Sequence, residues 1–247
     1  RDQIKLCVVD EAHCISQWGL YFRPFYKEIP YFLNTIFGEG NWPIVLGLTA
    51  TLNTKDKEQI CSDFHIEKAN VIKSDMLLRP TIDITIVKVA NEDAKDVKFW
   101  ELLNAHKHEK VLVYLDRKRG KRSTESLCEL ALSQGFIASF FHGELTSEEK
   151  AEVVRKFKSG ELLTVFATSA FGMGIDIPDI RGVIHYLITE STEQYYQQIG
   201  RVGRDGNPSW AVLFYSDKNV DVRRKDYIMK SFPGKKEIKF AFSNLTD

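Results

Sequence analysis

The feature that most constrains this chain is a series of short, unbroken apolar runs separated by longer amphipathic stretches. Several runs are rich in Val and Ile and do not alternate with polar residues, a pattern typical of parallel strands buried on both faces. Strands that alternate with helices predict an α/β fold with parallel sheets. The predicted strands cover residues 5–9, 44–48, 71–73, 82–89, 111–115, 137–141, 163–167, 182–187 and 210–215.

Two stretches between the predicted strands carry the S/T-x-x-E/Q pattern of a helix capping box. The string TSEE at residues 146–149 predicts a helix that ends at Gly160, and STEQ at residues 191–194 predicts a helix that ends near Gly200. Glycine is favoured just beyond the last turn of a helix, so each stretch has both a start and a stop signal.

A boundary between two lobes is predicted at residues 75–80, which contain a proline and separate one strand–helix series from the next. The chain has 247 residues, 43% of them hydrophobic, which suffices for two modest domains. We expect an incomplete first lobe at residues 1–78, a nearly complete second lobe at residues 79–230, and a polar, Lys-rich tail at residues 231–247.

Composition narrows the choice of partners. The 34 Lys and Arg residues balance the 34 Asp and Glu residues, so any nucleic-acid contact must come from local basic patches. The cysteines show no C-x-x-C spacing, which argues against a zinc site and indicates a reducing, intracellular compartment such as the cytoplasm. The apolar runs are far shorter than the roughly 20 residues of a membrane span, so no membrane partner is expected.

The predicted strand at residues 5–9 runs directly into two carboxylates, Asp10 and Glu11. Open α/β sheets bind ligands at the carboxyl ends of their strands. Adjacent carboxylates there suit a nucleoside triphosphate, because one holds Mg²⁺, usually through water, and the other positions or deprotonates the attacking water. The alternative is a surface turn with two chance acids.

A second polar stretch, Thr49 and Thr51, follows the predicted strand at residues 44–48. Small hydroxyl side chains at a strand end can link a hydrolysis site to a neighbouring lobe by hydrogen bonds. The alternative for such a stretch is an ordinary helix cap.

Further along the chain, glycines and arginines follow predicted strands and helices. Gly172 and Gly174 allow the backbone to approach a ligand closely, and Asp176 is placed to take a ribose hydroxyl. Arg201 and Arg204 stand three residues apart at the end of a predicted helix and can lie on one face. A guanidinium at a γ-phosphate acts as an arginine finger, whereas the alternative is a basic turn.

Taken together, these strings resemble the RecQ branch of superfamily 2 helicases. The resemblance covers residues 4–217, and it depends on four strings: DEAHCISQWG followed by FRP, then LGLTAT, FGMGIDIPDIRGVIH and YYQQIGRVGRDG. The CISQWG run after the DEAH box separates RecQ-like proteins from DEAD-box and DEAH RNA helicases. The resemblance implies two RecA-like lobes that use ATP and Mg²⁺ to move 3′→5′ along single-stranded or forked DNA.

The resemblance also implies roles for the residues of the ATP site. Asp10 would coordinate Mg²⁺ through water, Glu11 would be the catalytic base, and His13 would couple hydrolysis to DNA. Arg201 and Arg204 would reach across the cleft between the lobes, with Arg204 as the finger. Gln197 would stand beside them, and Gly172, Gly174 and Asp176 would contact the nucleotide.

An aromatic-rich stretch follows the DEAH box, and in RecQ proteins such a loop senses single-stranded DNA. We expect Trp18, Phe22 and Arg23 to contact DNA, since aromatic faces stack on bases. The alternative for Trp18 and Phe22 is core packing. Leu20 and Tyr21 stand where the family usually has His-Asp, which leaves open how the loop couples DNA to hydrolysis. Core packing is the prediction for five aromatic residues downstream: Phe25, Tyr26, Tyr31, Phe32 and Phe37.

A basic run, RKRGKR at residues 117–122, follows the predicted strand at residues 111–115. By resemblance, Arg117 and Lys118 contact the DNA backbone. His142 and Thr168, which each follow a strand, are expected to touch DNA as well. The alternative for a charge run of this kind is a solvated face.

The phosphate-binding pattern G-x-x-x-x-G-K-[ST] does not occur in the 247 residues. We therefore expect the chain to begin within the first lobe and to hydrolyse ATP negligibly by itself. The strand at residues 5–9 would then expose apolar surface, so self-association through the first lobe is a further expectation. Two alternatives stay open: a non-catalytic module that binds single-stranded DNA or a partner, and an RNA helicase of the same superfamily.

Overall fold

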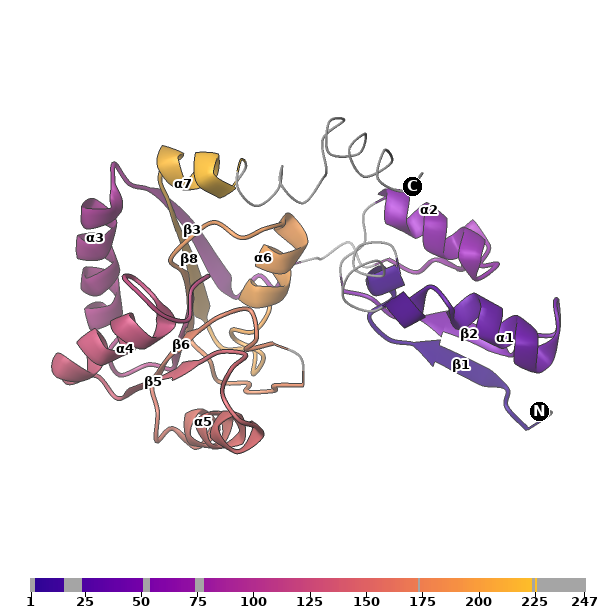
Figure 1. The fold of residues 1–247 in the computed structure, drawn as a ribbon, viewed down its shortest axis with the longest axis horizontal. Coiled ribbons are helices and arrows are strands. Elements are labelled where there is room, and N and C mark those ends of the chain that lie inside the picture. Colours follow the sequence, from indigo (N-terminus) through magenta and orange to yellow (C-terminus); the bar gives the residue numbers. More distant parts are fainter. Residues whose placement is uncertain are drawn as a thin grey trace, which may run out of the picture. The chain divides into compact units, whose positions relative to one another are not determined.

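The computed structural model describes residues 3–15, 24–50, 54–73, 78–172, 174–223 and 225. The chain divides into two compact units, Arg1–Leu77 (unit 1) and Leu78–Asp247 (unit 2), and each has its own parallel sheet and its own core (Figure 1).

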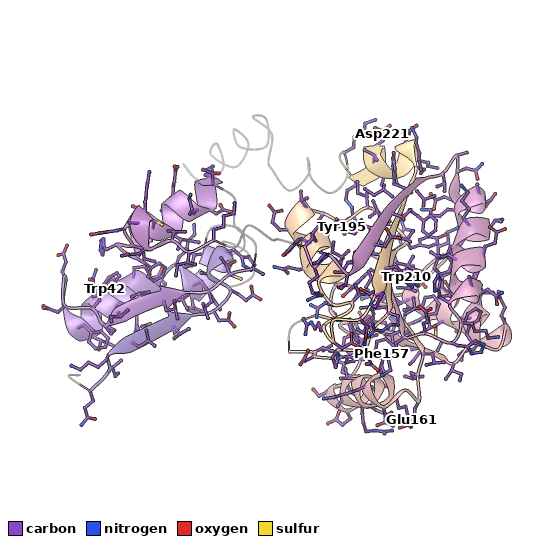
Figure 2. All side chains as sticks on the ribbon, turned by 180° about the vertical axis from the view of Figure 1, so that it is seen from behind. Trp42, Phe157, Glu161, Tyr195, Trp210 and Asp221 are labelled. Atoms are coloured by element: carbon purple, nitrogen blue, oxygen red, sulfur yellow. The ribbon has the colours of Figure 1, made fainter. Side chains whose placement is uncertain are left out.

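Unit 1 is built on a sheet of two parallel strands, β1 (Leu6–Val9) and β2 (Ile44–Gly47), in which Leu6 pairs with Ile44. Its helices are α1 (Ile29–Phe37) and α2 (Thr54–Asp63), with short 3₁₀ turns η1 (Ala12–Ile15), η2 (Pro24–Tyr26) and η3 (Lys68–Asn70). Trp42 packs against the core of this unit, edge to face with Phe64 (Figure 2). The core residues are Val9, Ala12, Ile15, Leu33, Ile60 and Phe64.

Among the described residues, only one face of the unit 1 sheet is covered. Successive residues of a strand point to opposite faces, so Val9 is buried in the core while Leu6 and Val8 are each 51% exposed. On β2, Ile44 and Leu46 are likewise exposed. The prediction that the first strand exposes apolar surface is confirmed.

Unit 2 contains a six-stranded, all-parallel sheet in the order β3-β8-β7-β4-β6-β5. Its strands are β3 (Ile82–Lys88), β4 (Val111–Tyr114), β5 (Ala138–Phe141), β6 (Thr164–Ala167), β7 (Gly182–His185) and β8 (Ser209–Tyr215). Its helices are α3 (Glu92–Ala105), α4 (Thr124–Ser133), α5 (Ser147–Ser159), α6 (Thr192–Ile199) and α7 (Asp217–Val222).

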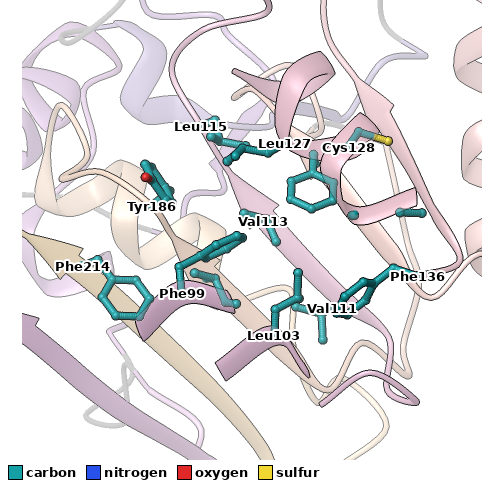
Figure 3. Close-up of a cluster of buried hydrophobic side chains, with 14 of the residues drawn as sticks. Phe99, Leu103, Val111, Val113, Leu115, Leu127, Cys128, Phe136, Tyr186 and Phe214 are labelled. Carbon is teal, nitrogen blue, oxygen red and sulfur yellow. The ribbon is translucent and has the colours of Figure 1, made fainter. Parts of the chain in front are cut away.

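Both faces of the unit 2 sheet are buried. On one face, α3 and α4 pack against the sheet, and Figure 3 shows Phe99 and Leu103 of α3 beside Val113 and Val111 of β4. On the other face, α5 and α6 contribute to a second core, in which Phe157 has no exposed surface (Figure 2). All four residues of β4 are buried, as its unbroken apolar run predicts.

The predicted helix signals are correct for one helix and half correct for the other. In α5, the Thr146 hydroxyl accepts from the Glu149 N–H and the Glu149 carboxylate accepts from the Thr146 N–H, and the helix ends at Gly160 with a left-handed φ of 84°. In α6, Ser191 accepts from the Gln194 N–H, but the Gln194 side chain accepts from the Glu190 N–H instead of closing the box.

Two sets of fold predictions were wrong. Residues 71–73 form no strand. Three of the downstream aromatic side chains are exposed, Phe25 at 81%, and also Tyr31 and Phe32. The reason is helical spacing: α1 turns Ile29, Leu33 and Phe37 toward the core and Tyr31 and Phe32 away from it. Tyr26 and Phe37 do pack against the core, as predicted.

Candidate functional site

The two carboxylates after β1 sit in a tight turn. Glu11 adopts a left-handed φ of 51°, and the Asp10 carboxylate accepts a hydrogen bond from the Glu11 N–H at 2.9 Å. The Ala12 N–H donates to the Leu48 carbonyl at 2.9 Å, which joins this turn to the end of β2. The residues after both strands of unit 1 are therefore held side by side.

His13 connects these two strand ends. Its ring is buried, and Nδ1 lies 3.0 Å from the Thr49 hydroxyl and 3.2 Å from Glu11 Oε2. Glu11, His13 and Thr49, which the sequence predicted to act together, are thus brought into one hydrogen-bonded group. Thr51, the other predicted coupling residue, lies outside the described residues.

In unit 2, the loop after β6 meets the turn after α6. The Arg201 guanidinium donates from Nη1 to the Gly172 carbonyl at 2.8 Å, and Arg204 donates to the Asp176 carboxylate at 2.6 Å. A Cβ on Gly172 would come within 3.2 Å of the Ser169 carbonyl oxygen, so a side chain at this position would crowd the loop. The predicted nucleotide-contacting loop and the two arginines therefore lie together, with Asp176 paired to Arg204.

The turn that carries the arginines, residues 200–206, is itself held by backbone bonds. The Gly203 N–H donates to the Ile180 carbonyl at 2.9 Å, and the Asp205 N–H donates to the Pro178 carbonyl at 3.2 Å. Arg181 binds the Asp205 carboxylate and holds its pKa well below the usual value. We refer to residues 200–206 as the arginine turn.

Arg79 also contacts the arginine turn, although no sequence pattern predicts this contact. Arg79 donates from Nη2 to the carbonyls of Gly200 and Val202, each at 2.6 Å. Residues 75–80 were interpreted only as a boundary, and no local pattern marks Arg79, because its partners are more than a hundred residues away.

A buried polar group links the strands of unit 2 to α6. His185 Nε2 lies 2.8 Å from Gln198 Oε1, and burial lowers the pKa of His185 to about 4, so its ring is neutral at pH 7. Tyr114 stacks on His185 and donates its hydroxyl to the Phe171 carbonyl at 2.9 Å. Gln198 is the buried glutamine of this helix, whereas Gln197, which was predicted as a site residue, is half-buried.

Most cations of the basic run are already paired. Lys118 binds Glu144, Arg119 lies 3.0 Å from Glu144, and Arg122 binds Asp96 at 2.6 Å. Within the described ranges, neither Arg117 nor Lys121 has an ion-pair partner. A surface hollow of about 550 Å³ brings together four of the predicted DNA-contacting residues: Arg117, Lys118, His142 and Thr168.

His142, which the sequence predicts to touch DNA, is mostly enclosed. Its side chain is 3% exposed, its Nε2 lies 3.0 Å from Glu125 Oε1, and its ring stacks on Phe140. A ring enclosed in this way offers little surface to a nucleic acid, so the DNA contact of His142 stays a prediction that this burial disfavours. The three residues of the predicted aromatic contact, Trp18, Phe22 and Arg23, lie outside the described residues.

Comparison with known proteins finds similar helicases. Residues 94–206 match the family described as "Helicase conserved C-terminal domain". The chain is 37% identical over 222 residues to the ATP-dependent DNA helicase RecQ of Bacillus subtilis, and 30% identical over 239 residues to the ATP-dependent helicase SGS1 of Saccharomyces cerevisiae. Over most of its length the chain is similar to RecQ-like helicases.

The RecQ-like chain matches only part of each relative. The match covers 90% of the chain but 36% of Bacillus subtilis RecQ, and 89% of the chain but 15% of SGS1. A relative with a different printed activity, the putative ATP-dependent RNA helicase R290 of Acanthamoeba polyphaga mimivirus, is 32% identical over 96% of the chain and 42% of that protein.

Solved structures confirm the predicted fold class of the RecQ-like chain, RecA-like α/β with parallel sheets. Saccharomyces cerevisiae Dbp5 bound to RNA and ADP BeF3 matches with a TM-score of 0.69 at 23% identity, over 90% of the chain and 57% of Dbp5. A DEAD box protein from Methanococcus jannaschii matches with a TM-score of 0.56 over 93% of the chain and 58% of its own. No helix in the described parts of the chain has the length and apolarity needed to cross a membrane.

Proposed function

We propose that this chain supplies the DEAH-box and arginine-turn parts of an ATP-dependent DNA helicase that moves 3′→5′ along single-stranded or forked DNA. The observation that carries the proposal is the hydrogen-bonded group of Glu11, His13 and Thr49 at the strand ends of unit 1. In this proposal residues 1–78 and 79–230 belong to two RecA-like lobes, residues 231–247 form a tail, and the protein works inside the cell on DNA.

The residues of unit 1 fit magnesium and ATP. Among the described residues no group of three or more His, Cys, Asp or Glu side chains could hold a metal ion by itself. Mg²⁺ at nucleotide sites usually has only one or two carboxylates, with waters and phosphate oxygens as its other ligands, so Asp10 suits it through water. Bound Mg²⁺-ATP supplies the terminal phosphate that is transferred to water.

Glu11 is the proposed general base, with Oε2 as the atom that takes a proton from the attacking water. The His13 ring keeps the carboxylate oriented, since its Nδ1 lies 3.2 Å from that oxygen and 3.0 Å from the Thr49 hydroxyl. A change at Thr49 would therefore reach Glu11 through His13. This gives the proposed coupling between hydrolysis and DNA a physical route within unit 1.

The arginine turn is proposed to bind the phosphates of a nucleotide. Arg201 is held on the Gly172 carbonyl, while Arg204 is paired with Asp176 at 2.6 Å. Arg204 would exchange the carboxylate for a phosphate oxygen, which releases Asp176 to accept a ribose hydroxyl. Gly172 and Gly174 leave room for the nucleotide, and Gln197 stands beside the two arginines.

The proposed DNA contacts combine stacking with phosphate binding. Arg117 and Lys118 at the hollow would bind the backbone, with Thr168 beside them. Trp18, Phe22 and Arg23 would stack on or pair with single-stranded DNA. DNA is favoured over RNA because the chain is 37% identical to a relative named as a DNA helicase, RecQ of Bacillus subtilis, and 32% identical to the putative RNA helicase R290.

The test is fluorescence anisotropy with labelled single-stranded DNA and RNA of one sequence. We expect tighter binding to DNA, and Trp18→Ala should weaken it about tenfold, since one stacked base contributes ~1–3 kcal/mol. Phe32→Ala, an exposed aromatic position on α1, is the matched control and should change nothing. Equal or tighter binding to RNA would favour the RNA-helicase alternative.

The alternative of a binding module without turnover is favoured by one observation, the absence of G-x-x-x-x-G-K-[ST] from the 247 residues. Both ideas give negligible ATP hydrolysis by the purified chain, so steady-state turnover tests them only by its presence. We expect negligible turnover. Mg²⁺-dependent turnover that Glu11→Gln abolishes would contradict that expectation and would exclude the binding-module alternative.

A further inference from the structure

Arg79 is the second residue of unit 2, yet its side chain reaches the arginine turn at the end of α6. Its Nη2 donates to two carbonyl oxygens, those of Gly200 and Val202, at 2.6 Å each. These two carbonyls lie on either side of Arg201 in the chain. The guanidinium therefore holds the backbone directly before and after one of the two arginines.

The position of this contact follows from the chemistry of helix ends. The last carbonyls of an α-helix have no partner within the helix, and the helix dipole places partial negative charge there. Helix α6 ends at Ile199, with Gly200 as its C-cap. A guanidinium at the Gly200 carbonyl satisfies one of these oxygens and complements the dipole, so Arg79 acts as a cationic cap supplied from a distant part of the chain.

The rest of the arginine turn is held from the other side. The N–H groups of Gly203 and Asp205 donate to the carbonyls of Ile180 and Pro178. Those bonds fix the second half of the turn. In the first half, the N–H groups of Arg201 and Val202 donate to the carbonyls of Gln198 and Ile199 at 3.3 Å each, and Arg79 adds its bonds to the carbonyl oxygens. Because the Arg201 side chain must reach the Gly172 carbonyl, the orientation of the backbone at residues 200–202 decides where its guanidinium lies.

We propose that Arg79 is a positioning residue for the arginine turn, holding Arg201 in the orientation in which it meets the loop after β6. The inference rests on the proposed function in one respect, namely that the arginine turn binds nucleotide phosphates. The positioning itself is a property of unit 2 and is measurable without turnover. It also ties the turn to the residues at which unit 2 begins.

Both hydrogen bonds come from a single nitrogen, which makes the idea easy to test by substitution. The Nε of Arg79 is buried and has no hydrogen-bond partner among the described residues, so Nη2 carries the contact. Lysine offers one nitrogen with three donors and keeps the charge. Methionine keeps the apolar stem but has no donor. Arg79→Lys should therefore restore what Arg79→Met removes.

The experiment uses the ¹⁵N-labelled 247-residue chain and follows two signals by nuclear magnetic resonance. One is amide hydrogen exchange at Arg201 and Val202, whose N–H groups lie in the half of the turn that Arg79 contacts, and the other is the side-chain Nε–H resonance of Arg201. In Arg79→Met we expect exchange at these amides to rise about tenfold, since a hydrogen bond to a charged group contributes at least the free energy of a factor of ten. The Arg201 resonance should shift, and Arg79→Lys should restore both signals.

The matched control is Arg155→Met, which removes an exposed arginine of α5 that pairs with Glu152 and Glu161. It should leave both signals unchanged. Unchanged signals in Arg79→Met, equally faster exchange throughout unit 2, or failure of lysine to restore them would each overturn the proposal. If Arg79→Met does not fold, the unmutated chain decides, because the Nη2 protons of Arg79 should show hindered rotation and slow exchange with water.

These outcomes are independent of the proposed function. A chain that fails to bind single-stranded DNA would contradict the helicase proposal while the Arg201 resonance still responded to Arg79. Conversely, the chain could bind DNA while both signals stay unchanged in Arg79→Met. That result would support the helicase proposal and contradict the positioning role of Arg79.

Discussion

The two units differ in how completely their sheets are covered by helices. The sheet of unit 2 has six strands with helices on both faces, and its central strand is fully buried. The sheet of unit 1 has two strands and one covered face, which leaves Leu6, Val8, Ile44 and Leu46 exposed on the other. Parallel sheets are normally covered on both faces, so unit 2 carries its own stability and unit 1 presents an unsatisfied apolar surface.

The largest expected effect separates a buried from an exposed aromatic ring. Phe99 in unit 2 has no exposed surface, and its ring packs edge to face on Tyr186 with the ring centroids 5.2 Å apart. Phe99→Ala should therefore lower the free energy of unfolding of unit 2 by about 3–5 kcal/mol. Phe32→Ala on α1 should cost unit 1 less than about 1 kcal/mol. Denaturant unfolding measures both values. Equal losses of unfolding free energy in the two variants would contradict the difference in packing between the units.

A second effect should lower the free energy of unfolding of unit 2 at acid pH. Burial lowers the pKa of His185 to about 4, below its value of 6.5 in the unfolded chain, so the stability that the neutral ring contributes is complete above pH 6.5. It is lost as pH falls through 6.5 toward 4, by up to roughly 3 kcal/mol. Urea unfolding at pH 7 and pH 4 measures the loss. His185→Gln, which cannot titrate there, should lose less, and an identical pH dependence in both proteins would exclude His185 as the cause.

Hydrogen exchange compares the two sheets directly. Amides of β4, which are hydrogen-bonded between β6 and β7, should exchange at least about a hundredfold more slowly than those of β1, because local opening is easiest where few apolar contacts must be broken. Mass spectrometry of peptides from each strand measures the difference. Equal protection of β1 and β4 in a monomeric chain would show that unit 1 is as stable as unit 2.

The smallest expected effect concerns self-association through the exposed face of unit 1. Val8→Lys or Leu46→Lys should weaken association about fivefold to tenfold, since each removes roughly 1 kcal/mol of apolar burial from a contact. Leu132→Lys, an exposed leucine of α4 in unit 2, is the matched control. Sedimentation velocity over a range of concentrations measures the change. A chain that stays monomeric at all concentrations would contradict the idea.

The candidate site was predictable where its signals are local. The DEAH string, the threonine after β2 and the glycine loop after β6 each follow an apolar run, and the structure brings Glu11, His13 and Thr49 into contact as expected. Spacing could not reveal which partners the charged residues would choose. Asp176 pairs with Arg204, and Lys118 pairs with Glu144, although both were predicted to face a ligand.

The sequence by itself determined eight of the nine predicted strands, the helix start at Thr146 and the order of the family strings, because apolar periodicity and capping depend on residues a few positions apart. Only the tertiary structure decided that Phe32 is exposed, that His142 is enclosed beside Glu125, and that Arg79 caps α6. Burial and ion pairing depend on which distant groups meet, and that is settled by the packing of the whole unit.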